Sequence, residues 1–397
     1  MNARSDGLNI AMVTESYRPD AGGLERSTAQ IATELCQRGH RVTLLAGACP
    51  DTDCLPGVTI QALARRKDAS AFRLYRFYRW AIRRIAEGGF DTSLSVTSTI
   101  PAAVIQPRGG TARETLLRNI AMRSSAVSRM GKQLAVRISP KHQLLLALEK
   151  RAFSHPGLVK VVAVSRYVCQ QLEQHYGVSS EKIELVPNAA VMPEVTDSQR
   201  DEWRRCIREQ FQIPDTTTAF LFAAINPKLK GYSLLLKALA ILKDRGVPAV
   251  VLLAGDFWHR HAREAEQAGV RERVRFIRHT RRIEALYAAA DVTVHPTYYD
   301  PASKVVIESL MMGVPAISTS YNGASDWIEP VDGRERGRVI QDMSTAQPLA
   351  DAMQALTEPD TRRACRDACE GIRDSLSMVR HVDHLERILL ESARSNP

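Results

Sequence analysis

The segment HPTYYDPASKVVIESLMMGVPAIST, residues 295–319, places two carboxylates around the start of an apolar run. Asp300 precedes the run, and Glu308 lies eight residues later on the helix that the run predicts. In a purely structural role, Asp300 would cap the helix and Glu308 would form an ordinary salt bridge. In a binding role, both carboxylates would accept hydrogen bonds from the hydroxyl groups of a ligand.

Pro301 suits the first turn of this helix, where its missing N–H is not needed. The backbone N–H groups of Ala302, Ser303 and Lys304 would then be available to an anion. A phosphate held there, with hydroxyl groups on both sides of it, describes a nucleotide sugar. The segment therefore favours a binding site for a sugar, a diphosphate and a ribose.

Two other loops carry residues that suit a phosphate. In AGGLE, residues 21–25, Gly22 and Gly23 would let the backbone approach a ligand just before a helix. In NPKLKG, Lys228 and Lys230 lie between a predicted strand and a predicted helix. Two cations beside a helix N-terminus would suit a diphosphate. A tight turn and ordinary surface lysines are the alternative interpretations.

These loops belong to an alternation of apolar runs and helical patterns. The runs predicted as strands are 8–13, 41–47, 90–96, 103–107, 158–165, 182–188, 217–225, 248–256, 273–279, 290–296 and 314–320. The helical patterns between them include 24–39, 232–246, 284–290 and 303–313. Strand, helix and strand in repeated order predict parallel sheets, in which ligands bind at the carboxyl ends of the strands.

The length of 397 residues allows two such domains. The alternation of predicted strands and helices stops in a polar, proline-containing stretch around 189–215 and then begins again. We therefore expect an α/β protein with two doubly wound, Rossmann-like domains facing across a cleft. The expected bounds are 1–195 for an acceptor-binding domain and 196–375 for a donor-binding domain, with a helix in 376–397 that packs back toward the first domain.

The positive charge of the chain is concentrated in one window. The formal net charge is +10, and residues 61–160 contain 19 Lys or Arg against 5 Asp or Glu. Within this window, residues 73–89 interleave arginines with aromatic side chains, which suits an anionic membrane surface or a phosphate-rich ligand. A solvated helix with exposed arginines is the alternative. No apolar stretch reaches the roughly 20 residues of a membrane span, so we expect a cytoplasmic protein that can associate peripherally with the inner face of the cell membrane.

Taken together, these motifs resemble the retaining glycosyltransferases of the GT-B fold, family 4. The resemblance runs from the AGGLE loop to the C-terminal helices. The stretch 299–328, with IQPRGG at 105–110 and NPKLKG, is most similar to the bacterial enzymes that add a sugar to the lipopolysaccharide core, the core glucosyltransferase I type. Asp300 and Glu308 match the paired acids of the family, with Asp in place of the usual first Glu.

The resemblance implies a role for each candidate residue. Asp300 would hold hydroxyls of the donor sugar, and Glu308 would hold the ribose. Lys230, with Lys228 beside it, would neutralise the leaving diphosphate, so that these three residues, Asp300, Glu308 and Lys230, would carry catalysis. The remaining donor contacts would be Gly22, Gly23, Ala302, Ser303 and Lys304.

On the acceptor side, Arg108 in the IQPRGG loop is a candidate contact. Besides Asp300 in place of Glu, the sequence departs from the family pattern in two further respects. Lys228 replaces a common Arg, and no acidic residue occurs around PAAVI, residues 101–105.

We therefore expect a hexosyltransferase that moves glucose from UDP-glucose, with retention, to a hydroxyl of an anionic glycolipid such as lipopolysaccharide core. No metal-ligand spacing occurs in the sequence, and we expect no cofactor beyond the nucleotide-sugar substrate. A nucleotide-sugar epimerase or hydrolase with the same donor site is the first alternative. A nucleic-acid-binding protein is the second, which the pI of about 9.4 invites but no motif supports. An inactive scaffold is the third.

Overall fold

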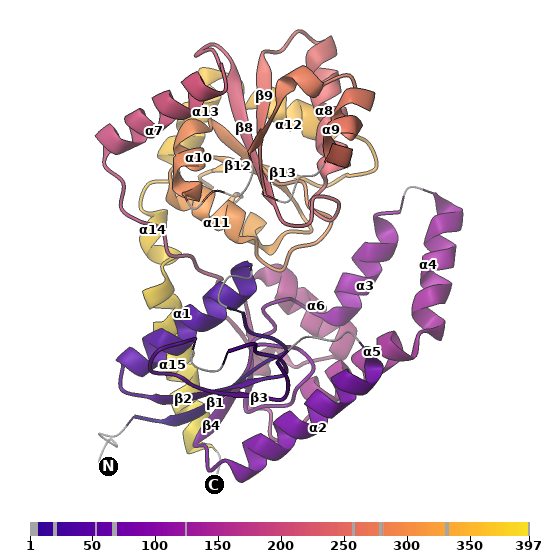
Figure 1. Ribbon diagram of the computed structural model, residues 1–397, viewed down its shortest axis with the longest axis vertical. Coiled ribbons are helices and arrows are strands. Elements are labelled where there is room, and N and C mark those ends of the chain that lie inside the picture. The colour runs from indigo at the N-terminus through magenta and orange to yellow at the C-terminus, as the bar shows by residue number, and fades with distance from the viewer. Residues whose placement is uncertain are drawn as a thin grey trace. The chain divides into compact units, whose positions relative to one another are not determined.

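The computed structural model describes residues 7–18, 22–51, 54–65, 70–123, 125–255, 259–277, 280, 282–329 and 333–395. The chain forms two compact α/β units, which are described separately below (Figure 1). The first unit comprises Met1–Asn188 and Met378–Pro397, and the second comprises Ala189–Ser377. The division lies a few residues before the expected boundary at 195.

A parallel sheet forms the centre of the first unit. Its strands are β1 (Asn9–Thr14), β2 (Arg41–Ala46), β3 (Thr59–Ala62), β4 (Thr92–Ser95), β5 (Val104–Ile105), β6 (Lys160–Ala163) and β7 (Ile183–Leu185). They lie in the order β3-β2-β1-β4-β5-β6-β7. Ile10 pairs with Val42 on one side and with Thr92 on the other. The strand order thus reverses beside β1, and such a switch point opens a crevice at the carboxyl ends of the strands.

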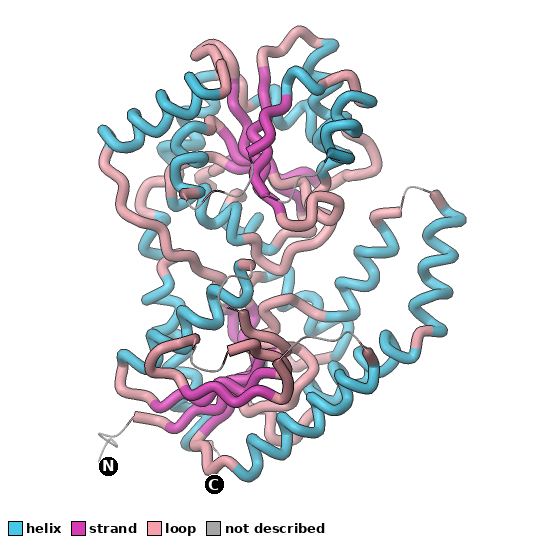
Figure 2. The backbone as a smooth tube through the Cα atoms, viewed as in Figure 1, coloured by secondary structure: helices cyan, strands magenta, loops and turns pink. Residues whose placement is uncertain are grey.

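Helices cover this sheet, as the tube in Figure 2 shows. They are α1 (Gly23–Gln37), α2 (Ala71–Glu87), α3 (Ala112–Ala121), α4 (Ala126–Ile138), α5 (Pro140–Phe153), α6 (Arg166–Tyr176), the 3₁₀ helix η1 (Ser180–Lys182) and α15 (Met378–Arg394). Ser and Thr residues cap several of them; for example, the Ser70 hydroxyl accepts a hydrogen bond from the N–H of Arg73 at the start of α2. Helix α2 buries Phe77 and Ala81 and leaves its arginine-rich face outward.

The helix α15 completes the first unit although it follows the whole second unit in sequence. It packs on α1 and β4. Its side chains Leu385 and Leu389 are fully buried. Arg38 at the end of α1 donates to Asp383 at 2.6 Å and to Glu386 at 2.8 Å. The last helix is therefore part of the core of the first unit.

The second unit repeats the same plan. Its strands are β8 (Thr218–Ala224), β9 (Ala249–Gly255), β10 (Val274–Ile277), β11 (Val292–Val294), β12 (Ala316–Thr319) and β13 (Gly337–Ile340). They lie in the order β10-β9-β8-β11-β12-β13, with parallel pairing. The switch point therefore lies between β8 and β11, and loops after these two strands line the crevice there.

The helices of the second unit flank its sheet on both faces, with apolar clusters beneath them. They are α7 (Asp197–Gln210), α8 (Tyr232–Asp244), α9 (His259–Gln267), α10 (Ile283–Ala289), α11 (Lys304–Met311), α12 (Gln347–Ala355), α13 (Pro359–Asp367) and α14 (Ile372–Ser375). The second unit also contains the 3₁₀ helices η2 (Arg271–Arg273) and η3 (Gly323–Trp327). Among the residues that the structure describes, no helix is both long and apolar enough to cross a bilayer.

All the runs predicted as strands contain a strand. Two strands were not predicted, namely β3 and β13. Both lie at the edge of their sheet, and their sequences TIQA and GRVI are too short and too polar to stand out. The helices α3, α4 and α5 between β5 and β6 were not predicted either. They form an insertion on the first unit that follows no strand–helix alternation.

Candidate functional site

The loops after β8 and β11 bring Lys230 and Asp300 together. The ammonium Nζ of Lys230 lies 2.5 Å from Oδ2 of Asp300, and it also approaches the carbonyl of Tyr299 at 3.4 Å. Both side chains are mostly buried, with 19% of Lys230 and 15% of Asp300 exposed. The two residues predicted to handle the sugar and the diphosphate thus form an ion pair at the carboxyl ends of neighbouring strands.

Gly231 makes this approach possible. Its φ is +83°, and a Cβ added there would lie 2.0 Å from the carbonyl oxygen of Pro296. Only glycine fits both the left-handed backbone and the close contact. The N–H of Tyr298 then donates to the carbonyl of Leu229 at 2.9 Å, so the loop after β8 is bonded directly to the loop after β11.

The backbone of Asp300 is fixed by the segment after β12. Its N–H donates to the carbonyl of Tyr321, and its own carbonyl accepts from the N–H of Gly323, each at 2.9 Å. Burial alone would raise the pKa of the Asp300 carboxyl, but Lys230 and His295 together outweigh burial and hold this pKa well below its usual range. Asp300 is therefore a carboxylate at neutral pH, and its oxygens act only as acceptors.

His295 lies beneath this pair. The imidazole is 1% exposed, and its Nε2 lies 3.3 Å from the Ser303 hydroxyl and 3.7 Å from Oδ2 of Asp300. Its Nδ1 is buried without a hydrogen-bond partner among the described residues. Burial, helped by the charge of Lys230, lowers the pKa of His295 although Asp300 acts in the opposite direction. The imidazole is therefore neutral at neutral pH.

The prediction for the start of the helix was wrong in detail. Helix α11 begins at Lys304, so Pro301 lies before the helix instead of in its first turn. The N–H of Ala302 donates to Oδ1 of Asp300 at 3.2 Å, and the N–H of Ser303 donates to Oδ1 of Asn322 at 3.1 Å. These two N–H groups hold the loop in place and are not available to an anion in this conformation.

Glu308 lies on α11, one turn beyond its start, and is half-buried. The hydroxyl of Tyr287 approaches Oε2 of Glu308 at 3.0 Å and the carbonyl of Val305 at 3.1 Å. Burial and the charge of Glu308 raise the pKa of Tyr287 well above its usual value, so the hydroxyl keeps its proton and donates. Tyr287 thereby fixes the direction of the Glu308 carboxylate.

The other predicted donor contacts lie at loop ends. Lys228 is exposed, two residues before Lys230 in the turn that follows β8. Gly22 is the N-terminal cap of α1, and Gly23 is the first residue of that helix. The φ of Gly22 is −50°, so its backbone conformation does not require glycine. If glycine is needed at position 22, the reason is that a side chain there would keep a ligand away from the backbone.

Arg108, the predicted acceptor contact, is buried in the first unit. It donates to Oε1 of Gln106 at 3.0 Å and to Oδ1 of Asn188 at 2.8 Å. The Nδ1 of His381 donates to the carbonyl of Pro187, so its Nε2 is left to accept from Arg108 at 3.4 Å. Burial lowers the pKa of Arg108 to about 10. Among the described residues, the hydrogen-bond partners of this guanidinium are Gln106, Asn188 and His381, none of which is a carboxylate.

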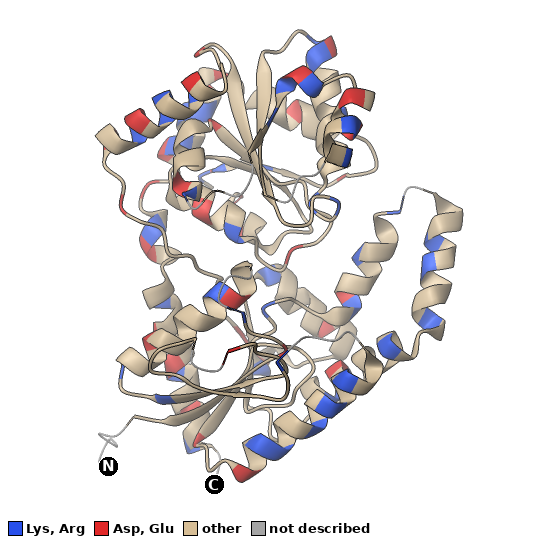
Figure 3. Cartoon of the chain, in the orientation of Figure 1, with Lys and Arg blue, Asp and Glu red and all other residues tan. Residues whose placement is uncertain are grey.

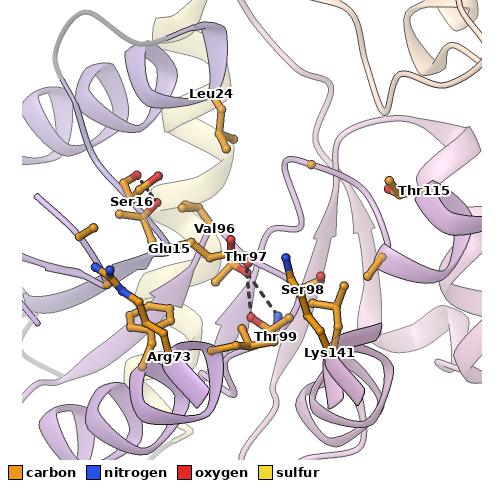
Figure 4. Close-up of a pocket in the computed structure, with 18 of the residues that line it drawn as sticks. Glu15, Ser16, Leu24, Arg73, Val96, Thr97, Ser98, Thr99, Thr115 and Lys141 are labelled. Carbon is orange, nitrogen blue, oxygen red and sulfur yellow. Dashed lines mark hydrogen bonds between the residues drawn. The ribbon is translucent and has the colours of Figure 1, made fainter. Parts of the chain in front are cut away.

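A pocket of about 430 Å³ opens beside the switch point of the first unit (Figure 4). Residues after β1 and β4 line it, among them Glu15 and Thr97, whose hydroxyl donates to Oε1 of Glu15 at 3.3 Å. Arg73 from α2 and Lys141 from α5 bring positive charge to the same pocket. The Nη2 of Arg73 is buried and has no hydrogen-bond partner among the described residues. The pocket combines acceptors for hydroxyl groups with cations for an anionic group.

Several of these residues escaped the sequence analysis. His295 and Gly231 lie inside motifs that were already quoted, and the histidine directly after a strand was a usable signal. Tyr287 on α10 and the pocket residues Arg73 and Lys141 come from other elements, and no spacing in the sequence joins them to the site. Among the described residues, no group of three or more His, Cys, Asp or Glu side chains is arranged to hold a metal ion.

Comparison with known families identifies both halves of the chain. Residues 21–190 match the family described as Glycosyltransferase Family 4, and residues 204–370 match the family described as Glycosyl transferases group 1. The lipopolysaccharide glucosyltransferase WaaG of Escherichia coli K12 is 21% identical over 92% of this chain and 94% of its own length. A probable transglycosylase of Burkholderia thailandensis, BTH_I0986, is 28% identical over 94% of both chains.

Solved structures agree with these matches at the level of the fold. The crystal structure of WaaG superposes with a TM-score of 0.76 at 20% identity and covers 96% of this chain and 99% of its own. Anabaena Alr3699/HepE, solved in complex with UDP-glucose, superposes with a TM-score of 0.68 at 16% identity over 97% of this chain and 100% of its own. With its two parallel-sheet α/β units and its two family domains, the chain belongs to the glycosyltransferases of the GT-B fold and is a hexosyltransferase.

Proposed function

We propose that the protein transfers glucose from UDP-glucose to a hydroxyl of an anionic glycolipid of the lipopolysaccharide-core type, with retention at the anomeric carbon. The observation that carries the proposal is the buried pair of Lys230 and Asp300 at the switch point of the second unit. A cation and an acceptor-only carboxylate in one place suit a ligand that carries a diphosphate beside sugar hydroxyls.

Each residue has a distinct role in this proposal. Lys230 contacts the diphosphate, and the exposed Lys228 adds a second positive charge at the mouth of the site. Asp300 accepts hydrogen bonds from hydroxyls of the sugar. Glu308, held by Tyr287, accepts them from the ribose. In the ligand-free protein the charge of Lys230 is neutralised by Asp300. When the donor binds, the ammonium of Lys230 would exchange part of its hydrogen bonding with Asp300 for hydrogen bonds to the diphosphate, so its charge stays paired.

The remaining donor contacts stay part of the proposal. Gly22 and Gly23 would let the start of α1 approach the phosphates. In the loop before α11, Ala302 and Ser303 use their N–H groups internally, so these residues would shape the site and Lys304 would add a donor at the helix start.

In the reaction, the bond between the anomeric carbon and the diphosphate oxygen breaks while the acceptor oxygen bonds to that carbon. The proton of the acceptor hydroxyl passes to the departing diphosphate, on the face where the new bond forms. Lys230 and Lys228 stabilise the negative charge that grows on the leaving group, which is the electrostatic contribution that usually dominates. No divalent ion is required in this scheme.

Two relatives support the choice of substrates. The Escherichia coli relative is described as a lipopolysaccharide glucosyltransferase, and the Anabaena relative binds UDP-glucose in its crystal structure. On the acceptor side, the pocket of the first unit offers Glu15 for hydroxyls and Arg73 with Lys141 for an anionic group of the acceptor. Arg108 lies outside the lining of this pocket and would act only by supporting it.

A peripheral association with an anionic membrane fits the basic window at 61–160. Figure 3 shows Lys and Arg positions in blue along the ribbons of α2 and α4. On α4, four apolar side chains are 60–80% exposed and recur every three or four residues: Val127, Met130, Leu134 and Ile138. An apolar stripe flanked by cations is typical of helices that lie in a membrane interface.

The donor half of the proposal is tested by calorimetric titration with UDP and UDP-glucose, in EDTA and again with Mg²⁺. We expect binding in both buffers by the wild type and its loss in Glu308→Ala. The matched control is Glu264→Ala, a change on α9 outside the site. If the wild type binds neither UDP nor UDP-glucose, the donor assignment is overturned. If it binds them only in the presence of Mg²⁺, the metal-independent scheme is overturned.

The membrane half is tested with sedimentation of vesicles that contain anionic lipid. Met130→Glu and Leu134→Glu together should weaken binding, since each inserts a charge into the apolar stripe. The control is Val379→Glu, at an exposed apolar position 57% accessible on α15. Equal sedimentation of both variants and the wild type would contradict a role for α4.

A further inference from the structure

Arginine is the most frequent residue type in the lining of a further pocket, which lies in the second unit. It has a volume of about 340 Å³ and lies among α7, α10 and α13. Asp291, directly before β11, and Val314, before β12, are part of its lining. The pocket is therefore at the amino ends of the strands, away from the loops that hold Lys230 and Asp300. Its five arginines are Arg200, Arg204, Arg362, Arg363 and Arg366.

The acidic residues of this arginine pocket do not balance that charge. Among the described residues, the acidic side chains that line it are Asp201 and Asp291. The carboxylate of Asp291 is already used, because Oδ1 accepts from Arg204 at 2.8 Å and Oδ2 accepts from the N–H of Ala219 at 2.8 Å. Among the described residues, Asp201 forms no ion pair. Arg204 thus pairs with Asp291, and Arg363 pairs with Asp360 at 3.8 Å. Arg200, Arg362 and Arg366 form no ion pair with any described residue, and Asp201 is the one unpaired carboxylate of the described lining.

Two of the arginines have donors that nothing in the described protein uses. The Nε of Arg200 is buried without a hydrogen-bond partner, although its Nη1 donates to the carbonyl of Met312 at 2.8 Å. The side chain of Arg366 makes no hydrogen bond or ion pair with any described residue. Burial and then the positive charge of Arg204 lower the pKa of Arg366, while Asp291 opposes this effect. Like charges held this close repel one another unless an anion lies between them.

We propose that the arginine pocket binds a phosphate-class oxyanion, either free phosphate or the phosphate group of a small metabolite. The planar guanidinium presents paired N–H donors that match two oxygens of a phosphate. The volume falls within the usual range for a small-molecule site, roughly 300–1,000 Å³. A bound phosphate would use the free donors of Arg200 and Arg366 and remove the repulsion among the arginines.

The arginine pocket also adjoins the residues that hold Glu308 of the proposed donor site in place. Tyr287 is part of its lining and also holds Glu308. Arg200 binds the carbonyl at the end of α11, the helix that carries Glu308. A ligand in the arginine pocket therefore contacts the elements that position this carboxylate.

The test is the melting temperature of the full chain titrated with inorganic phosphate and, separately, with glucose 6-phosphate, at constant ionic strength set with chloride. We expect a saturable rise for the wild type. Arg366→Gln and Arg200→Gln should each weaken the apparent affinity at least about tenfold, as the loss of a charge-assisted hydrogen bond predicts. Without phosphate, Arg366→Gln should melt slightly higher than the wild type, because one repelling charge is removed.

Two controls separate this site from the proposed donor site. Arg263→Gln, exposed on α9 outside the pocket, should respond like the wild type. Lys230→Met should also keep the phosphate response, whether or not the protein binds UDP. A stronger response to glucose 6-phosphate than to inorganic phosphate would assign the oxyanion to a metabolite, and the reverse would assign it to free phosphate. Equal responses of the wild type and both arginine variants, or loss of the response in Lys230→Met alone, would overturn the proposal.

Discussion

At the scale of single residues, the candidate site is governed by the balance between Lys230 and Asp300. Their contact at 2.5 Å keeps the carboxylate ionised and fixes the ammonium at the end of β8. Asp300 has a shorter side chain than the Glu usual in the family, yet it reaches Lys230 directly. The pair is therefore formed before any ligand binds, which lowers the cost of organising the site.

Replacing the buried lysine should harm transfer much more than replacing the exposed one. Lys230→Met removes the cation that we propose faces the leaving group, and we expect kcat to fall about 100-fold or more, as for the loss of one preorganised donor. Lys228→Met, at an exposed position, should cost about tenfold or less. Steady-state kinetics with UDP-glucose measure both, and similar losses in the two variants would contradict separate roles.

His295 should make the stability of the second unit depend on pH. The folded protein keeps this imidazole neutral, whereas the unfolded chain takes up a proton below about pH 6.5. Protons thus favour the unfolded state, and the free energy of unfolding should fall as the pH drops below about 6.5, by up to about 1.4 kcal/mol per pH unit. Asp300 does not contribute there, since its carboxyl titrates only in more acidic solution.

Urea unfolding at several pH values between about 5 and 7 measures this slope. His295→Gln should flatten it, and His259→Gln, at an exposed position on α9, should leave it unchanged. An unchanged slope in His295→Gln would mean that the buried imidazole takes up its proton without unfolding.

The residue types of the candidate site were proposed from the sequence, but the partners of these residues could not be. Asp300, Glu308 and Lys230 stand in short motifs whose spacing carries the prediction. The helix start at Lys304 was missed because the prediction relied on Pro301, whereas the bridge from Asp300 to the segment after β12 postpones the helix. Such a contact joins distant parts of the chain, and no local pattern records it.

At the scale of elements, the candidate site depends on how closely two loops approach. Gly231 lets the loop after β8 lie against Pro296, and the hydrogen bonds from that contact place Lys230. The insertion of α3, α4 and α5 illustrates the opposite case. No alternation of strand and helix predicts these three helices. The apolar stripe of α4 is exposed, whereas an apolar stripe on a helix usually faces the core.

Gly231→Ala should therefore destabilise the second unit more than another glycine with the same backbone conformation. Gly246, after α8, has φ +69° and open space where a Cβ would lie. Gly246→Ala should cost about 1–2 kcal/mol from backbone strain alone. Gly231→Ala should cost about 1–3 kcal/mol more, because its Cβ would also displace Pro296.

Chemical unfolding of the two glycine variants gives this difference directly. Calorimetry with UDP on the same samples should find weaker binding only in Gly231→Ala. Equal stability of the two variants would contradict the requirement for close contact between the loops.

At the scale of the whole molecule, two similar units are joined by a chain that leaves the first unit, forms the second and returns. The parallel order of both sheets follows from the alternation of apolar runs and helices, so the architecture could be predicted from the sequence. For the C-terminal helix, the sequence predicted only that it packs toward the first domain. The elements that α15 contacts, α1 and β4, could not be predicted, because they lie hundreds of residues earlier in the chain.

Leu385→Ala should destabilise the first unit, since this fully buried side chain of α15 lies in its core. We expect a loss of about 2–5 kcal/mol, the range for such cavities. Leu390→Ala, at a position 36% exposed on the same helix, should change stability by about 0.5 kcal/mol. Hydrogen exchange read by mass spectrometry should find faster exchange in β1, β4 and α1 and unchanged exchange in β8 to β13. Acceleration spread equally over both units would contradict this division.

The return of α15 also has a consequence for synthesis on the ribosome. The hydroxyl of Thr92 in β4 pairs at 2.6 Å with that of Ser392, which is translated 300 residues later. Residues 189–377 form a continuous segment that can fold as soon as it emerges, whereas the first unit must wait with an uncovered apolar face until its last helix is made. The half of the enzyme that is translated first thus completes its folding last. A product truncated before α15 would leave the apolar face of the first unit uncovered, and proteases and chaperones can recognise such a surface.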